Sequence, residues 1–129
     1  MGKYLGIDYG LARIGLATAD TETKIASPLT TVSPKDLVAS IEREGPFEQV
    51  VVGLPRRLDG TDTPQTLAVR RFSDDVLWRK LRIDPVFQDE AGTSGVAEDR
   101  LKDSGKPYAK GDIDAEAASI ILQDYLDSL

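Results

Sequence analysis

Three acidic residues lie where predicted strands end or where a predicted helix turns toward the sheet. Asp8 lies late in an apolar strand, and Glu90 ends another short apolar run. Asp114 is on the inward face of the last predicted helix, one turn before Ala118. Ligands of open α/β sheets gather beyond the carboxyl ends of strands, so we expect these three acids to converge.

Three converging carboxylates repel one another and lose water, which is unfavourable unless a divalent cation lies among them. Oxygen ligands of this kind suit Mg²⁺ or Mn²⁺. Two such ions about 3.5–4 Å apart can activate a water and stabilise the leaving oxygen of a phosphodiester. Each acid alone also has a structural explanation: a turn contact for Asp8, a solvated strand end for Glu90, or a helix-dipole contact for Asp114. Taken jointly, we interpret them as metal ligands and catalytic residues.

The composition narrows the possible chemistry. The 129 residues include no His and no Cys, which excludes Ser-His-Asp hydrolysis, cysteine nucleophiles and thiolate zinc sites. With 40% hydrophobic and 29% charged residues, the chain is typical of globular proteins, and its length predicts one domain over residues 1–129. We see no leader pattern and no apolar run long enough for a bilayer, so we expect a cytoplasmic protein without a membrane partner.

The charge is unevenly distributed. The net charge is −6, which disfavours nucleic acid as a partner, but residues 54–82 carry seven Lys or Arg against four acids. We predict that Arg56 and Arg57, in a loop of this segment, contact a nucleic-acid backbone. Other basic residues of the segment are expected only to solvate the outer face of a helix: Arg70, Arg71, Arg79 and Lys80.

Hydrophobic periodicity predicts the elements that must position these residues. Strands are expected at 3–9, 13–20, 24–32, 49–52 and 83–90, and helices at about 33–44, 63–81, 93–102 and 112–127. Thr63 and Pro64 have the types expected where a helix begins. In that helix, Leu67 is expected on the buried face and Trp78 in the core. The pattern predicts an α/β fold, with a mixed sheet covered by helices.

Several blocks of the sequence resemble one known family over nearly the whole chain. The segments "YLGIDYGLARIGLATAD", "IASPLTTV", "VVGLPRRLDGT", "QDEAGTS" and "DIDAEAASIILQDYLD" are similar to the YqgF family, Holliday junction resolvase-like proteins of the RNase H-like superfamily. The resemblance implies an RNase H-like fold with a mixed five-stranded sheet. It also implies metal-dependent phosphodiester cleavage, and a role in trimming the 5′ end of the 16S ribosomal RNA precursor.

The resemblance also implies roles for single residues. The metal-binding acids of the family fall on Asp8, Glu90 and Asp114, and Arg13 matches a position near the phosphate path. Ala91-Gly92 stands where the family usually has Arg-Leu, which affects substrate affinity or the placement of Glu90. Apart from the resemblance, the loop before Asp114 carries basic and aromatic residues that are suited to holding a phosphate or stacking a base: Lys106, Tyr108 and Lys110.

Four functions remain open from the sequence. The leading hypothesis is an Mg²⁺- or Mn²⁺-dependent nuclease acting on structured RNA, with precursor ribosomal RNA as its partner. A branched, four-way DNA substrate would favour a homodimer over a monomer. A nucleotide-binding half of an actin-like or sugar-kinase ATPase would explain the "GIDYG" strand, but such proteins need two similar domains. A non-catalytic RNA-binding relative of the nuclease is the fourth.

Overall fold

The described part of the chain forms five strands and four α-helices, and two short helical segments of other types adjoin α1 and α2. The computed structural model describes residues 2–90 and 93–129. The strands are β1 (Lys3–Tyr9), β2 (Ile14–Asp20), β3 (Ala26–Val32), β4 (Gln49–Leu54) and β5 (Val86–Asp89). The helices are α1 (Leu37–Glu44), α2 (Pro64–Phe72), α3 (Thr93–Asp103) and α4 (Lys110–Asp127), with a 3₁₀ turn η1 (Pro34–Asp36) and a π-helical segment η2 (Ser73–Trp78). The predicted order of strands and helices is confirmed.

The strands form one mixed sheet in the order β3-β2-β1-β4-β5. β1 pairs antiparallel with β2, which pairs antiparallel with β3, whereas β1, β4 and β5 run parallel. Parallel strands end at the same edge of a sheet. The register places Asp8 opposite Gly15 of β2, and Leu54 of β4 beside Asp89 of β5. The ends of β1, β4 and β5 therefore lie together.

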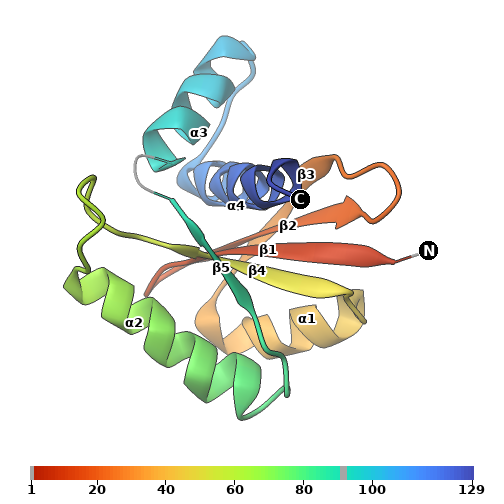
Figure 1. Cartoon of the computed structure of the whole chain (residues 1–129). Helices are drawn as coiled ribbons and strands as arrows, with labels where there is room; N and C mark the ends of the chain where they lie inside the picture. Colours follow the sequence, from red (N-terminus) through yellow and green to blue (C-terminus); the bar gives the residue numbers. More distant parts are fainter. Residues whose placement is uncertain (1, 91–92) are drawn as a thin grey trace.

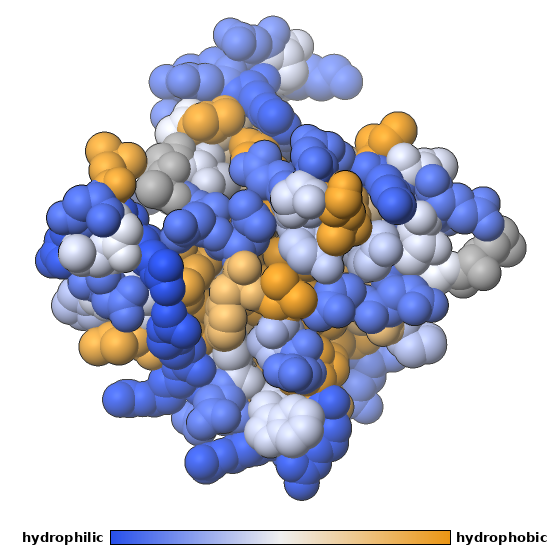
Figure 2. All heavy atoms as spheres, viewed as in Figure 1, coloured by the Kyte–Doolittle hydropathy of each residue, from blue (hydrophilic) through white to orange (hydrophobic). Residues whose placement is uncertain are grey.

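The helices cover both faces of the sheet. Figure 1 shows α4 and α3 on one side, and α1 and α2 on the other. Viewed from the same side, Figure 2 shows a central area of hydrophobic atoms surrounded by hydrophilic side chains. None of the helices in residues 2–90 and 93–129 combines the length and the apolar character needed to cross a membrane.

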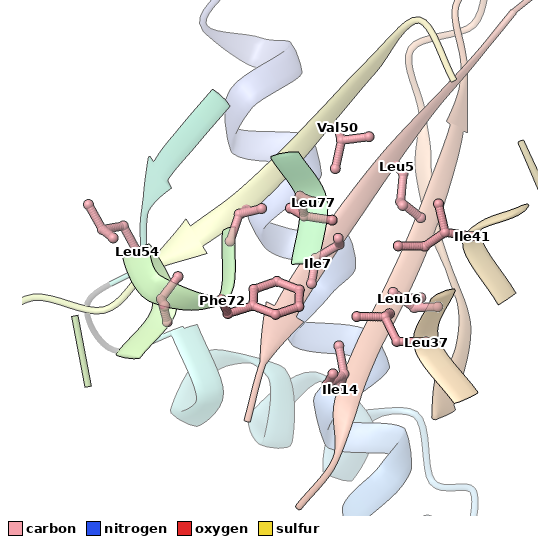
Figure 3. Packing of buried hydrophobic residues seen from close by; sticks show 12 residues of the cluster. Leu5, Ile7, Ile14, Leu16, Leu37, Ile41, Val50, Leu54, Phe72 and Leu77 are labelled. Carbon is pink, nitrogen blue, oxygen red and sulfur yellow. The ribbon is translucent and has the colours of Figure 1, made fainter. Parts of the chain in front are cut away.

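Large aliphatic side chains fill the face of the sheet toward α1 and α2. Figure 3 shows how they interdigitate between the strands and these helices. Leucines and isoleucines that are almost completely buried here come from four elements: Leu5, Ile7, Ile14, Leu16, Leu37 and Leu77. The ring of Tyr9 stacks on Phe72, with 4.2 Å between the ring centroids. This side is a conventional, well-filled hydrophobic core.

Small residues line the face of the sheet toward α4. A Cβ on Gly6 would lie 2.8 Å from the carbonyl oxygen of Ala118, and a Cβ on Gly15 would overlap the backbone of Asp114. Ala17 is also fully buried on this side. Because these strand positions carry little or no side chain, the backbone of α4 packs almost directly against the strands.

Two expectations for the helix after residue 63 are wrong. Leu67 has 57% and Trp78 46% of its surface exposed, so neither lies in the core. Residues 73–78 are π-helical, and Leu77 occupies the buried position of this turn. Trp78, one residue further round the turn, faces solvent. The predicted start of this helix is confirmed, because the Thr63 hydroxyl accepts a hydrogen bond from the Thr66 N–H.

Candidate active site

A pocket of about 400 Å³ lies at the edge where the parallel strands end. Asp8 comes from β1, Glu90 directly follows β5, and Asp114 comes from the first half of α4. Polar and charged residues on its wall include all three acids: Asp8, Arg13, Arg56, Gln65, Glu90 and Asp114. The structure therefore brings the three acids together, although they are far apart in the chain.

Glycines in the strands determine how Asp114 reaches this pocket. Gly15 lies beside Asp8 in the sheet, and the backbone of Asp114 packs directly on it. Gly6, two residues before Asp8, makes a similar contact with the next turn of α4. No larger residue fits at Gly15 without moving α4. The spacing between strand and helix, and with it the distance from Asp114 to Asp8, depends on this glycine.

Asp8 and Glu90 form a partly buried carboxyl pair. Burial, the negative charge of Asp8 and a hydrogen bond to Asp8 raise the pKa of Glu90 to about 9. Burial also raises the pKa of Asp8 to about 6, and the charge of Asp114 adds to this increase, whereas the hydrogen bond to Glu90 opposes it. The pair therefore holds one proton at neutral pH. Gly53 makes room for it, because a Cβ there would lie 2.9 Å from the Glu90 carboxyl carbon.

Asp114 is held by an ion pair. Arg13 Nε donates a hydrogen bond of 2.6 Å to Asp114 Oδ2, and 47% of the Arg13 side chain is exposed. Arg13, which directly precedes β2, thus lies on the wall of the pocket. Its guanidinium partly neutralises a third carboxylate beside the Asp8–Glu90 pair. Most of the negative charge of this pocket is therefore balanced by one proton and one arginine.

The donors of this pocket have the chemistry of a site for a hard cation. They are the oxygens of three carboxyl groups. Two of these groups, Asp8 and Glu90, share a proton that a cation can replace. Within residues 2–90 and 93–129, no three Asp, Glu, His or Cys side chains are already close enough together to hold a metal ion. A metal ligand role for Asp114 requires its carboxylate to turn from Arg13 toward the pair.

The predicted nucleic-acid contacts differ in their placement. Arg56 is on the pocket wall, with its Nε 3.2 Å from Asp62 Oδ1, and this Nε makes no hydrogen bond to the described residues. Arg57 is exposed, and its guanidinium donates to the Thr61 hydroxyl and the Asp62 carbonyl oxygen within its own loop. Lys110 is exposed at the first residue of α4 and is not on the pocket wall.

The other residues of the loop before α4 lie elsewhere. Lys106 and Tyr108 line a separate groove between β3, α3 and α4. The structure therefore does not place them at the acidic pocket. Ala91-Gly92, which replaces the Arg-Leu of the family, lies outside the described residues.

Sequence reasoning missed two residues that shape the pocket. Gln65 donates a weak hydrogen bond of 3.4 Å to the Tyr9 carbonyl and lines the pocket from α2. Gly15 is needed for the close packing of Asp114. A signal for this glycine was present, because a glycine inside a strand often marks a close approach of another group.

Comparison with known proteins gives a consistent result. A family model described as "RuvX: Holliday junction resolvase" matches residues 2–128. A protein of Chloroflexus aggregans (strain MD-66 / DSM 9485) named "Putative pre-16S rRNA nuclease" is 45% identical over 132 residues, covering 96% of this chain and 92% of that protein. A protein of the same name from Syntrophus aciditrophicus (strain SB) is 42% identical over 135 residues, covering 98% and 89%.

Solved structures with the same fold include two of RuvC. The structure described as "T. thermophilus RuvC in complex with Holliday junction substrate" has a TM-score of 0.58 at 17% identity, covering 99% of this chain and 95% of that one. A "Thermus thermophilus RuvC structure" has a TM-score of 0.55 at 15% identity, covering 98% and 95%. The expected RNase H-like fold, a mixed five-stranded sheet flanked by helices, is confirmed.

Proposed function

Because the chain belongs to the family described as "RuvX: Holliday junction resolvase", as its resemblance to YqgF proteins predicted, we propose that it is a nuclease hydrolysing phosphodiester bonds of structured RNA. Its substrate is the 16S ribosomal RNA precursor, by analogy with the names of relatives at 42–45% identity, and the resemblance to the YqgF family implies cleavage at the 5′ end. The observation that carries the proposal is the partly buried Asp8–Glu90 pair with Asp114 in one pocket.

We propose that Asp8, Glu90 and Asp114 hold Mg²⁺ or Mn²⁺. The bound ion supplies an activated water and stabilises the charge that develops on the leaving oxygen. Glu90 must give up its proton when the cation binds, so cation affinity rises with pH until that proton is lost. This role for the acids explains why the chain buries two carboxyl groups against each other at a cost in stability.

We propose that two arginines orient the phosphate. Arg13, half exposed beside Asp114, can release the Asp114 carboxylate and bind a substrate phosphate as Asp114 turns toward the cation. Arg56, which follows β4, also lines the pocket, and its buried Nε lacks a hydrogen bond to the described residues. A guanidinium binds phosphate oxygens in a defined geometry, so the two residues hold the scissile group between them.

The test compares a substitution of one acid of the pocket with a matched substitution of an acid outside it. Asp8→Asn keeps the size of the side chain and removes its charge, and we expect Mg²⁺-dependent cleavage to fall by at least about a hundredfold. Asp103→Asn, on the exposed end of α3, should cleave like the wild type. A fragment of precursor ribosomal RNA with a labelled 5′ end is the substrate. Full activity of Asp8→Asn would remove the basis of the proposal.

A four-way DNA junction is the second candidate substrate, since the matching family model carries a resolvase description. Rates of cleavage of a labelled junction and of the precursor RNA distinguish the two substrates. Both rates are measured at one stated salt concentration, because the strength of phosphate contacts depends on salt. We expect faster cleavage of the RNA. Paired cuts in the junction by a dimer, with no cleavage of the RNA, would reverse the assignment.

A further inference from the structure

A second pocket, of about 740 Å³, lies on the outer side of α2 and η2, beside the edge strand β5. Basic and aromatic side chains line part of it: Arg70, Arg71, Trp78 and Phe87. Acidic side chains line another part: Asp74, Asp75 and Asp84. None of these residues belongs to the acidic pocket described above. In Figure 2, hydrophobic atoms at the centre of the visible face are surrounded by hydrophilic ones.

Trp78 is presented to solvent at this pocket by an unusual local backbone. It is the only tryptophan of the chain and ends the π-helical segment, and such segments are frequent at functional sites. Arg82 follows with a positive φ of 57°, an uncommon conformation for a residue with a side chain. Its guanidinium lies 5.6 Å from the centre of the Trp78 ring. The chain thus exposes a large flat ring next to a cation, where burial would have been more stabilising.

The charges at the pocket indicate a base with amino groups rather than a free anion. A phosphate alone would meet three carboxylates on the same wall. Of these, Asp75 is paired with Arg79 at 3.8 Å. Carboxylates accept hydrogen bonds from the exocyclic amines of nucleobases. Unpaired bases of RNA are recognised in this way, by stacking on an aromatic ring and by hydrogen bonds to their edges.

The pocket is connected to the candidate active site by a chain of charged side chains. Asp62 lies 3.2 Å from Arg56 Nε and 4.0 Å from Arg70 Nε. Arg56 lines the acidic pocket and Arg70 lines the second one. Arg70 also lies over the Phe87 ring, 5.6 Å from its centre. Arg56 and Arg70 therefore connect the two pockets through the Asp62 that they share.

We propose that this second pocket binds an unpaired nucleotide of the RNA whose scissile phosphate lies in the acidic pocket. The base stacks on Trp78 and pairs with the carboxylates. The backbone phosphates beside it contact Arg71 and Arg82. This inference rests on the proposed nuclease function and adds a single-stranded requirement to the substrate. It also accounts for nucleic-acid binding by a chain with a net charge of −6.

The single tryptophan allows a direct measurement. An Asp8→Asn protein, which is not expected to cleave, is titrated in Mg²⁺ with a short single-stranded RNA of mixed sequence. Stacking on Trp78 should quench the tryptophan fluorescence, with the same Kd as that obtained from the anisotropy of labelled RNA. Unchanged fluorescence at RNA concentrations that saturate the anisotropy would overturn the proposal, and so would an absence of any RNA binding.

Substitutions of single residues test whether Trp78 is responsible for the binding of single-stranded RNA. In the same background, Trp78→Ala should weaken single-strand binding about tenfold, and Trp78→Phe should restore most of it. Ile25→Ala, which trims an even more exposed apolar side chain in the turn between β2 and β3, is the control and should bind like the parent. An unchanged Kd for Trp78→Ala would assign the pocket to another ligand, such as a protein partner.

The two proposals fail in different ways. A blunt RNA hairpin and the same hairpin with a single-stranded extension are compared as ligands. Loss of the preference for the extended hairpin in Trp78→Ala supports the subsite. If the wild-type protein cleaves no RNA but the quenching and this preference persist, the nuclease proposal fails and the subsite stands. Cleavage without quenching gives the opposite result.

Discussion

The two faces of the sheet are packed by different means. Toward α1 and α2, branched and aromatic side chains interdigitate, and Leu37 and Ile41 of α1 are almost completely buried among them. Toward α4, Gly6 and Gly15 bring the backbones of strand and helix into contact. Side chains can move to accommodate a change, whereas two backbones in contact cannot. The first face therefore supplies stability, and the second determines where one helix lies.

The difference has a functional reason. α4 carries Asp114, and a displacement of about 1 Å at a catalytic group can reduce the rate a hundredfold. Gly15 contacts Asp114 itself, beside Asp8 in the neighbouring strand. The face with the small residues thus determines the distance between two of the three acids, Asp8 and Asp114. No catalytic candidate among the described residues lies on α1.

Gly15→Ala should have the largest effect. The added Cβ would overlap the backbone carbonyl of Asp114, so α4 must move away from the sheet. We expect a loss of about 3 kcal/mol in the free energy of unfolding, together with a loss of at least about a hundredfold in cleavage by the folded protein. Urea unfolding and single-turnover cleavage measure the two quantities. Activity within about twofold of the wild type would show that α4 need not lie this close.

Leu37→Ala tests the opposite face. The side chain is 1% exposed, and its removal leaves a cavity between α1 and the sheet. We expect a loss of about 3 kcal/mol in stability, similar to that of Gly15→Ala, because large-to-small changes in a core cost about 2–5 kcal/mol. Cleavage per folded molecule should not change. A large loss of activity at full folding would mean that the two faces are not independent.

The features that the sequence could predict are those set by neighbouring residues, and the features that it could not predict depend on the packing of α4 against the sheet. Alternation in residues 3–9 and the pattern of Thr63 and Pro64 depend on local physics, and they predicted the strand and the start of α2. The positions of Asp8, Glu90 and Asp114 at the ends of elements were sufficient to place them in one pocket. The pairing of Arg13 with Asp114 was not predictable, because it joins residues 101 positions apart through the glycine contact.

Errors in the sequence-based expectations occurred where backbone geometry overrides periodicity. Helical spacing placed Trp78 in the core, but the π-helical turn gives that place to Leu77. Similarly, Lys106 and Tyr108 were expected over the acids because they precede Asp114 in sequence. The loop instead turns toward β3 and α3. Closeness in the chain did not imply closeness to the site.

Glu90→Gln should have a smaller effect on stability, in the opposite direction. Glu90 binds its proton more tightly in the folded protein, with a pKa of about 9 against an ordinary value of 4.5. In the metal-free protein, the contribution of this proton to stability is therefore complete below about pH 4.5 and is lost as the pH rises toward about 9. Glutamine cannot ionise, so we expect the variant to be more stable at about pH 9 by on the order of 1 kcal/mol.

Thermal unfolding with a chelator, at about pH 5 and about pH 9, measures this difference. The wild-type Tm should fall more than that of Glu90→Gln between the two values, while cleavage by the variant is lost. Saturating Mg²⁺ should reduce the pH dependence of the wild type, because the cation replaces the proton of the pair. Equal pH dependence in both proteins would argue against a buried, protonated Glu90.

Gly111→Ala should have the smallest effect. It tests whether every glycine at the interface of α4 with the sheet is as sensitive to substitution as Gly15. A Cβ on Gly111 would lie 3.6 Å from the Thr31 Cβ, which is an ordinary contact. Alanine reduces the entropy of the unfolded chain, so we expect the free energy of unfolding to rise by about 0.5 kcal/mol, with cleavage unchanged. Gly15 and Gly111 both lie at the interface of α4 with the sheet, but only Gly15 meets helix backbone. If Gly111→Ala in urea unfolding is as destabilising as Gly15→Ala, the whole interface is intolerant, and the special role assigned to the Gly15 contact is wrong.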